Sequence, residues 1–569
     1  MIVQISINYG GHDTSAALSI NDKIVAAAEQ ERYDLSKHSR NFPTEAINSC
    51  LEISKLKLSQ VDRLILTTDF PTGIRKFYLE PALKNNFMLK RLINEHDIIK
   101  NYLDFENKVR KKLNYKGEII TFHHHLCHIA SAYYPSGFNK ALILSLDGVG
   151  QFETGMLASA NNGKIKIHKF NANYPHSLGL IYSAITFFLG WKHHCDEGII
   201  MGLAPYGNPY RIVPKQSLRY IDVFRKIISI DKELGIKINT EWIAYHRQRN
   251  VWVSDKFKLL FGKKRDSNDK ITNHHKNIAA ALQLRLEEVV IATLKKIKKK
   301  YNINKLCIAG GVGLNCSLNG KIHNSNIFKE IFVQPASGDS GLVIGGLYLG
   351  IKNKFAKKLK IEKKYNNYLG STFTNKEIEK TLIKKKVKFK KIKNICKTTA
   401  SLLKDGKIVG WFQGGSEFGP RALGNRSIIC RPYPAKMKDY LNKKVKFREY
   451  FRPFAPAILK EKYKEYFHLN QESPHMLIAC KANKKKSNLI PAVVHVDGTC
   501  RVQTVSKETN LKFYNLIKEF NKLTSVPVVL NTSFNIKGQP MVNTPSQAID
   551  TFTGTKIDIL AIGDYIVFK

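Results

Sequence analysis

Short apolar runs joined by glycine-containing turns open the chain and return near residue 150. Alternating apolar and polar positions over residues 2–7 and 14–20, around a turn, predict a β-hairpin, with a third strand over 24–29. The second set of strands is expected at residues 141–146, 154–158 and 164–167. Two copies of one pattern predict an internal duplication in which paired hairpins face one nucleotide.

A third unit, made of a strand and a glycine turn, follows a long amphipathic helix. The predicted buried face of this helix carries Leu282, Leu286, Val289, Val290 and Ile297. A strand over 306–309 then runs through two glycines into a helix, whose N-terminus favours an anion. One such turn is also found in α/β proteins that bind nothing there, but three in this order are typical of the actin-like, duplicated ribonuclease-H-type ATPase fold. The predicted nucleotide contacts are Gly10, Gly11, Gly148, Gly150, Gly310, Gly311 and Asn315.

Histidines at the start of a predicted helix suggest a metal site. His124 and His128 stand four residues apart and share one helix face. Asp147 follows a strand, and Asp339 stands between a strand and a helix, so both can project a carboxylate. Two histidines and two carboxylates suit Fe(II), Mn or Zn better than calcium. Alternatively, these residues are polar helix caps that bind no metal. The histidine pair at residues 193–194 is a second candidate metal site.

The length of 569 residues predicts two large domains. We expect an N-terminal domain over residues 1–355, with a polar, irregular insertion at about 208–275, and a C-terminal α/β domain over 366–569. The lysine-rich stretch 351–367 is the predicted link. The fold class is therefore α/β.

Composition narrows the function classes. The net charge of +46 arises from 92 Lys and Arg against 46 Asp and Glu, but the excess is mostly lysine spread through helices and loops. This pattern indicates an AT-rich genome more than a dedicated nucleic-acid surface. Nine scattered cysteines without a CxxC pair indicate reduced thiols, and no apolar stretch is long enough for a membrane span. We expect a cytoplasmic protein.

Cations gather on loops of the C-terminal half. Arg421 and Arg426 stand on a turn-rich loop, and Lys446, Arg448 and Arg452 follow. The guanidinium fork binds phosphate oxygens through two hydrogen bonds, so these loops suit a phosphate ligand. A surface salt-bridge network is the alternative explanation.

Six motifs then carry a resemblance. They are residues 8–17 (NYGGHDTSAA), 124–128 (HHLCH), 201–207 (MGLAPYG), 417–427 (EFGPRALGNRS), 451–456 (FRPFAP) and 531–535 (NTSFN). Together with 495–504 (HVDGTCRVQT), they resemble the O-carbamoyltransferase family of nodulation-factor and antibiotic-tailoring enzymes over nearly the full chain. The resemblance implies a threonylcarbamoyl-transferase-like N-terminal domain with a metal, for which it favours iron, and a C-terminal domain resembling YrdC, the threonylcarbamoyl-adenylate synthase.

The implied reaction uses carbamoyl phosphate and Mg-ATP to form carbamoyl-adenylate, and then carbamoylates a hydroxyl of a sugar or secondary metabolite. Lys446 and Arg448 match the Lys-x-Arg phosphate binders of the YrdC-like fold, and Ser533 and Asn535 match its nucleotide motif. The chain departs from the family pattern at two positions, Leu35 and Ile199. Further predicted substrate or nucleotide contacts are Lys37, Arg421, Asn425, Arg426, Arg452 and Arg501.

His12 is the candidate general base or carbonyl hydrogen-bond donor, because it lies on the first glycine turn, and Asp13 is grouped with it as catalytic. Two other functions remain open: a threonylcarbamoyl-type tRNA modification enzyme, which the charge favours, and a non-catalytic actin-like ATP-binding regulator, which would not need the C-terminal cations. The acceptor is not predicted, and a homodimer is left open.

Overall fold

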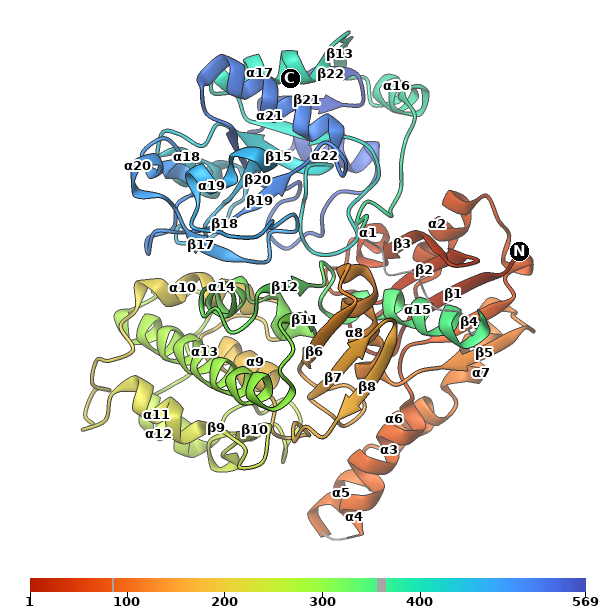
Figure 1. Ribbon diagram of the computed structural model, residues 1–569, viewed down its shortest axis with the longest axis vertical. Coiled ribbons are helices and arrows are strands. Elements are labelled where there is room, and N and C mark those ends of the chain that lie inside the picture. Colours follow the sequence, from red (N-terminus) through yellow and green to blue (C-terminus); the bar gives the residue numbers. More distant parts are fainter. Residues whose placement is uncertain (84–85, 356–364) are drawn as a thin grey trace. The chain divides into compact units, whose positions relative to one another are not determined.

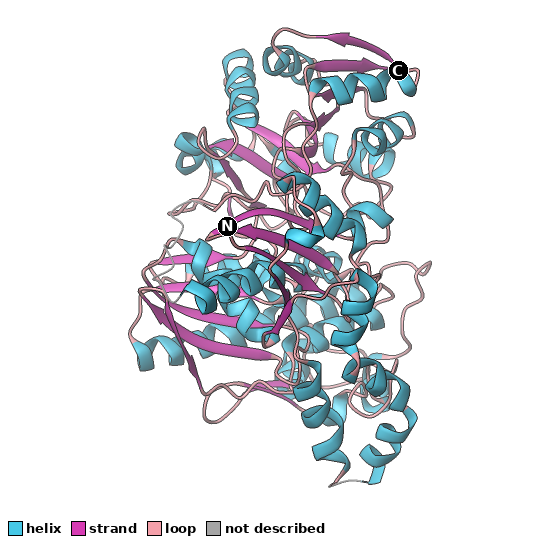
Figure 2. Cartoon of the chain, turned by 90° about the vertical axis from the view of Figure 1, so that its right-hand side faces the viewer, coloured by secondary structure: helices cyan, strands magenta, loops and turns pink. Residues whose placement is uncertain are grey.

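The computed structural model describes residues 1–83, 86–355 and 365–569 and divides into two units (Figure 1). Unit 1 comprises residues 1–30, 40–315 and 322–365, and unit 2 comprises residues 31–39, 316–321 and 366–569. Most of the predicted link, residues 356–364, lies outside the described residues. Strands flanked by helices occur throughout both units, which confirms the α/β prediction (Figure 2).

Unit 1 contains two five-stranded sheets with the same topology. The first has the order β3-β2-β1-β4-β5, with bounds Lys23–Glu29, Ser15–Ile20, Val3–Asn8, Arg63–Leu66 and Glu118–Thr121. The second has the order β8-β7-β6-β11-β12, with bounds Lys164–His168, Gly155–Asn161, Lys140–Leu146, Lys305–Ala309 and Glu330–Val333. In each, the first three strands pair antiparallel and the last two join in parallel. The duplication predicted from the glycine turns is confirmed.

Helices α8 (His124–Tyr133) and α15 (Leu342–Phe355) pack against one another beside these sheets. Two glycines in α15 permit close packing, one against α8 and the other against β1. A Cβ at Gly345 would overlap the backbone of Cys127 in α8, and one at Gly346 would press on Ser6 of β1. The small residues of α15 therefore fix α8, which carries the histidine motif.

The remaining longer helices of unit 1 are α2 (Thr44–Ser54), α5 (Asn86–Asn94), α6 (His96–Leu103), α7 (Phe105–Leu113), α9 (Leu178–Phe188) and α13 (Asn273–Tyr301). The buried face predicted for α13 is confirmed: all five of its apolar positions are at most 2% exposed. None of the described helices combines the length with the apolar character that a membrane span requires.

The prediction of a polar, irregular segment at 208–275 is wrong for much of its length. It contains α11 (Tyr220–Ile227), β9 (Ile228–Ile230), β10 (Ile236–Ile238) and α12 (Asp255–Phe261). Phe224 and Phe257 are fully buried, and α11 packs against α13. Charged residues between the apolar positions hid this amphipathic pattern, because they occupy the exposed face.

Unit 2 is built on one mixed sheet of eight strands in the order β13-β22-β21-β14-β15-β20-β16-β19. Their bounds are Lys388–Lys391, Tyr565–Phe568, Ile559–Ile562, Val409–Phe412, Arg426–Cys430, Val528–Ser533, Ala455–Leu459 and Gln503–Val505. Its main helices are α16 (Asn375–Lys384), α17 (Ile395–Lys404), α21 (Leu511–Thr524) and α22 (Pro545–Thr553). Helix α22 begins with a capping box, in which Thr544 Oγ1 accepts from the Gln547 N–H at 3.3 Å.

The nine cysteines are all free, and eight of them are buried, as the scattered spacing predicts. Burial raises the pKa of the Cys307 thiol to about 12 and that of Cys396 to about 11, with smaller effects from neighbouring groups. These thiols therefore behave as small apolar side chains of the core.

Leu282→Ala should lower the free energy of unfolding of unit 1 by about 2–5 kcal/mol, because it removes fully buried methyl groups from α13. Lys295→Ala, at an exposed position of the same helix, should change it by less than about 0.5 kcal/mol. The midpoints of urea unfolding, followed by circular dichroism, give the comparison. Equal midpoints for the two variants would contradict this account of the core.

Candidate metal centre and anion site

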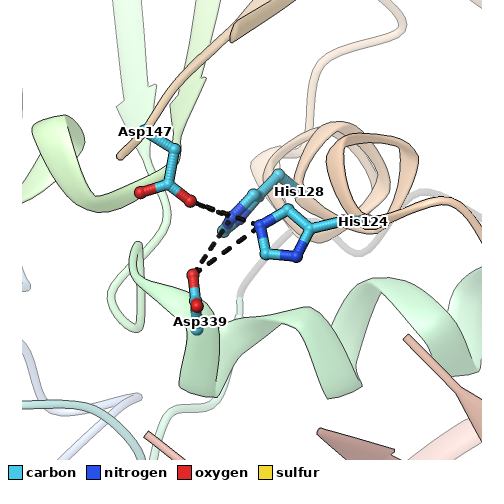
Figure 3. A group of neighbouring side chains, drawn as sticks. All are labelled: His124, His128, Asp147 and Asp339. Atoms are coloured by element: carbon cyan, nitrogen blue, oxygen red, sulfur yellow. Dashed lines mark hydrogen bonds and ion pairs between the residues drawn. The ribbon is translucent and has the colours of Figure 1, made fainter. Parts of the chain in front are cut away.

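Helix α8 points two imidazoles at one carboxylate (Figure 3). The Nε2 atoms of His124 and His128 lie 3.3 and 3.1 Å from Oδ2 of Asp147. Both histidines are buried. Although burial opposes the charged form of Asp147, hydrogen bonds from the two imidazoles hold its pKa well below the usual range.

Asp339 completes the group from the opposite side (Figure 3). Its Oδ1 lies 3.7 Å from Nε2 of both His124 and His128. One ligand atom from each of the four residues fits within a 4.8 Å span. Two ligands about 2.1 Å from one ion and roughly at right angles stand about 3 Å apart, so this spacing fits a divalent metal. The donor set suits Fe(II), Mn or Zn, and nothing in it selects among them.

Asp147 is held by the glycine turns on which we predicted phosphate contacts. Its Oδ1 accepts hydrogen bonds from the backbone N–H groups of Gly148, at 2.8 Å, and Gly311, at 3.0 Å. Gly310 has a φ of +84°, and a Cβ there would overlap the backbone of Leu146. In this geometry the two N–H groups orient a metal ligand.

The other two histidines of the run are bound elsewhere. His125 contacts Ser145 Oγ at 2.9 Å and the Glu153 carbonyl at 2.8 Å, and burial lowers its pKa to about 3. His123 pairs with the Glu153 carboxylate at 3.2 Å, which also binds Lys76. The i, i+4 spacing thus separates the inward-facing pair from its neighbours.

His12 lies at the edge of this group. Its Nε2 is 3.9 Å from Asp339 Oδ2, and its Nδ1 is 2.9 Å from Asp13 Oδ2. The side chain of Asn8 binds the carbonyl oxygens of His12 and Asp13, at 3.4 and 3.0 Å, and so shapes the turn. Asn8 was not predicted, although a polar residue ending a buried strand was a usable signal.

Among the described residues, His193 and His194 join no group that could hold a metal. His193 lies beside the Trp252 indole, with ring centroids 4.3 Å apart. Asn315 exchanges side-chain hydrogen bonds with Gln283, at 2.9 and 3.1 Å. The predicted nucleotide contact at Asn315 is thus an amide that fastens a turn to α13.

In unit 2, Lys446 is buried at 3% exposure. Its Nζ donates to the carbonyl oxygens of Ser533 and Asn535, both at 2.7 Å, and to Asn535 Oδ1 at 2.6 Å. Burial, reinforced by the charges of Arg448, Arg452 and Lys37, holds its pKa well below the usual range. The structure therefore brings together the four residues that the resemblance groups: Lys446, Arg448, Ser533 and Asn535.

Two arginines, Arg448 and Arg452, act electrostatically on this lysine, and Arg421 and Arg501 interact in turn with these arginines. Burial and the charges of Arg452 and Arg501 hold the pKa of Arg448 well below its usual range. Burial and the same two arginines lower the pKa of Arg421 to about 9. In the described parts of the chain, no carboxylate pairs with Arg421 or Arg501, and Arg452 has Glu449 at 3.6 Å. Such a group of like charges favours an anionic ligand.

Arg426 differs from these arginines. Its guanidinium donates to the carbonyl oxygens of Gln413, Ser371 and Gly414, at 2.6, 2.8 and 3.1 Å. It is fully buried at the start of β15 and stacks over Phe412. These contacts hold three backbone segments together. They use the guanidinium N–H groups that we predicted to bind phosphate.

Glu417, which was not predicted, organises the same motif. Its Oε1 accepts from the backbone N–H groups of Leu423, Asn425 and Arg426, at 2.7, 2.8 and 3.2 Å. The Asn425 amide contacts the Gly415 carbonyl at 2.7 Å. The loop thus folds around the buried carboxylate of Glu417. Of the two arginines in the loop, only Arg421 lies among the other cations.

Comparison with known proteins identifies the family of this chain. The family described as Carbamoyltransferase N-terminus matches residues 2–347, and that described as Carbamoyltransferase C-terminus matches residues 400–569. The chain is 36% identical to Nodulation protein NolNO of Sinorhizobium fredii, over 98% of this chain and 79% of the relative. It is 35% identical to protein sll1178 of Synechocystis, over 100% of this chain and 96% of the relative.

A solved structure of HypF from T. kodakarensis has a TM-score of 0.34 and 13% identity, covering 63% of this chain and 50% of that one. This likeness is too weak to support an argument. The sequence matches decide the class of protein: this is a transferase enzyme. The chain belongs to the carbamoyltransferase family.

Removing one imidazole should abolish tight metal binding. His128→Ala should weaken Mn²⁺ affinity at least tenfold in calorimetric titration, because three donors remain of four. His123→Ala, which alters the same run outside the group, should bind as the parent does. Loss of binding in both variants would place the ion elsewhere.

The arginines should separate into ligand-binding and structural residues. Arg421→Ala should lose most of the rise in melting temperature that inorganic tripolyphosphate gives the parent, while its own melting temperature changes little. Arg426→Ala should melt several degrees lower without ligand, because it leaves three carbonyl oxygens unpaired. Differential scanning fluorimetry measures both, and an unchanged tripolyphosphate effect in Arg421→Ala would contradict the assignment.

Proposed function

We propose that this carbamoyltransferase forms carbamoyl-adenylate in unit 2 and transfers the carbamoyl group to a hydroxyl in unit 1. Carbamoyl phosphate first loses inorganic phosphate to water, giving carbamate. A carbamate oxygen then attacks the α-phosphorus of Mg-ATP, and pyrophosphate leaves. The acceptor hydroxyl attacks the carbamoyl carbon, its proton goes to a base, and AMP leaves. A mixed anhydride is a better acyl donor to an alcohol than the starting phosphate.

The observation that carries the proposal is the cation group around Lys446. This group comprises Lys446, Arg448, Arg452, Arg421 and Arg501. Burial and nearby positive charges lower the pKa values of Lys446, Arg448, Arg421 and Arg501. A polyphosphate would offset this repulsion, and charge would build on the α-phosphate and pyrophosphate where these donors stand. Lys446 is already fixed by Ser533 and Asn535, so little reorganisation is needed.

In unit 1, His12 is the proposed base. When its Nδ1 donates to Asp13, at 2.9 Å, Nε2 is the unprotonated ring nitrogen and can take the hydroxyl proton. His124, His128, Asp147 and Asp339 would hold the divalent metal. When bound, that metal supplies Lewis-acid polarisation of the carbamoyl carbonyl.

Two carboxylates and two neutral imidazoles balance the charge of a divalent ion. This balance favours a centre that attracts the carbonyl oxygen without strongly binding an anion. The family match over nearly the whole chain gives no support to a non-catalytic regulator. Net charge is the only feature that favours a tRNA substrate, and charge alone carries no base recognition.

Lys446→Ala should abolish pyrophosphate release from protein supplied with ATP, Mg²⁺ and carbamoyl phosphate in the absence of acceptor. The loss follows because the buried ammonium is central to the proposed anion site. Lys444→Ala, at an exposed position nearby, should release pyrophosphate at the parental rate. A folded, metal-loaded parent that releases none would refute the two-step reaction.

A further inference from the structure

A helical arm extends from unit 1 between β4 and β5 (Figure 1). It begins with α3 (Phe70–Ile74), a π-helical turn (Arg75–Leu79) and α4 (Glu80–Ala82), and returns through α5 and α6. Helix α4 packs on α5, and α3 packs on α6. In Figure 1 the arm is orange and projects away from both sheets of the unit, and α4 and α5 form its tip.

The arm has an apolar core of its own. Its buried members are Ile74, Tyr78 and Ile99, and Phe77, Leu92 and Tyr102 pack against them, partly buried. The helices of the arm therefore already bury one apolar face against each other.

The tip carries a second apolar surface on its outside. Leu79 and Leu83 are 45% and 88% exposed, and Leu89 and Ile93 are 44% and 61% exposed. The members of each pair stand four residues apart, which places them on the same side of a helix. We call these four side chains the arm-tip patch. Single exposed apolar residues are normal, but four large ones within fifteen residues indicate an interaction surface.

Charge at the arm tip favours an anionic partner. Residues 75–100 contain six Lys and Arg against three Asp and Glu. Two of the carboxylates, Glu80 and Glu95, are paired with arginines at 3.0 and 3.1 Å, and Asp97 is exposed. Lys90 is exposed on α5 between two residues of the patch. An anionic surface would therefore meet aliphatic side chains and cations together.

Two observations argue against a second copy of this chain as the partner. Two copies would bring basic surfaces together in a chain whose net charge is +46. The four side chains also expose only a few hundred Å², whereas a stable dimer buries about 800 Å² per partner. Leucine is uncommon among the residues that dominate protein–protein binding. Leucine combined with lysine and arginine is typical of helices that lie on a membrane surface.

We propose that the arm-tip patch docks on a lipid bilayer that carries anionic headgroups. The aliphatic side chains of the patch would enter the boundary between the headgroups and the acyl chains. Lys90 and the neighbouring cations would bind the phosphates of the headgroups. This docking is independent of the proposed two-step reaction.

The base of the arm is fastened to the candidate metal centre. Gln151 Nε2 donates to the Asp69 carbonyl at 2.7 Å, and Gln151 Oε1 accepts from the His124 N–H at 2.8 Å. The Tyr102 hydroxyl donates to the Gly10 carbonyl, at 3.4 Å, in the turn that carries the proposed base. Docking of the tip would therefore hold the metal centre at a defined distance from the bilayer.

Vesicle flotation with the full-length protein tests the docking. The probes are vesicles of phosphatidylcholine alone and vesicles of equal parts phosphatidylcholine and phosphatidylglycerol. The parent should float with the anionic vesicles and remain behind with the neutral ones. Leu83→Glu should lower the bound fraction at least fivefold, because it removes an apolar contact and adds a negative charge. Ile93→Glu should have the same effect.

Leu259→Glu is the matched control, because Leu259 is 85% exposed on α12 of the same unit and the change of charge is identical. It should float as the parent does, and melting temperatures show that each variant is folded. Equal losses in Leu83→Glu and Leu259→Glu would mean attraction by net charge alone and would overturn the proposal. No flotation of the parent, or a parental dimer in sedimentation that Leu83→Glu dissociates, would also overturn it.

Discussion

The arrangement of unit 1 depends on how one carboxylate is shared. Asp147 turns Oδ1 toward the N–H groups of Gly148 and Gly311 and Oδ2 toward two histidines. Its own carbonyl accepts from Ser177 Oγ, at 2.9 Å, at the start of α9. One residue thus joins the ends of β6 and β11 to two helices. The ligand geometry is set by backbone that the duplicated sheets already hold in register.

In unit 2 the clustered charges are positive, whereas the shared group in unit 1 is a carboxylate. Its cations are brought together and partly removed from water, where each disfavours the charge of the next. Such an arrangement costs folding free energy, and it persists because other contacts hold the loops. Glu417 binds three backbone N–H groups and Arg426 binds carbonyl oxygens, so the scaffold residues satisfy the backbone. Preorganised donors of this kind can favour charge that develops during reaction.

Much of unit 1 was predictable because local signals and global topology agree. Strand alternation and glycine turns located both β1 to β3 and β6 to β8, and the i, i+4 histidines identified the inward face of α8. The pairing of Asp339 with these histidines depends on long-range packing, which spacing does not encode. Its position between a strand and a helix was the one local indication.

In unit 2 the sequence alone could not distinguish ligand-binding residues from structural residues. Arg421 and Arg426 look alike in the motif, yet one faces cations and the other faces carbonyl oxygens. The difference arises because Arg426 begins β15, an inner strand that pairs with β14 and β20, and is fully buried there. Likewise, the apolar face of α11 in the segment 208–275 was concealed by the charged residues between its apolar positions.

The glycine turns of unit 1 serve two purposes. Gly10 has a φ of +99° and packs under Phe70, so no larger residue fits. At Gly11 a Cβ would meet no described atom within 4 Å, so packing does not explain this glycine. By contrast, the N–H of Gly311 is already bound to Asp147. The two turns therefore differ in role: the Gly311 turn, which follows β11, anchors a metal ligand, and the Gly11 turn leaves backbone beside His12 that a ligand can approach.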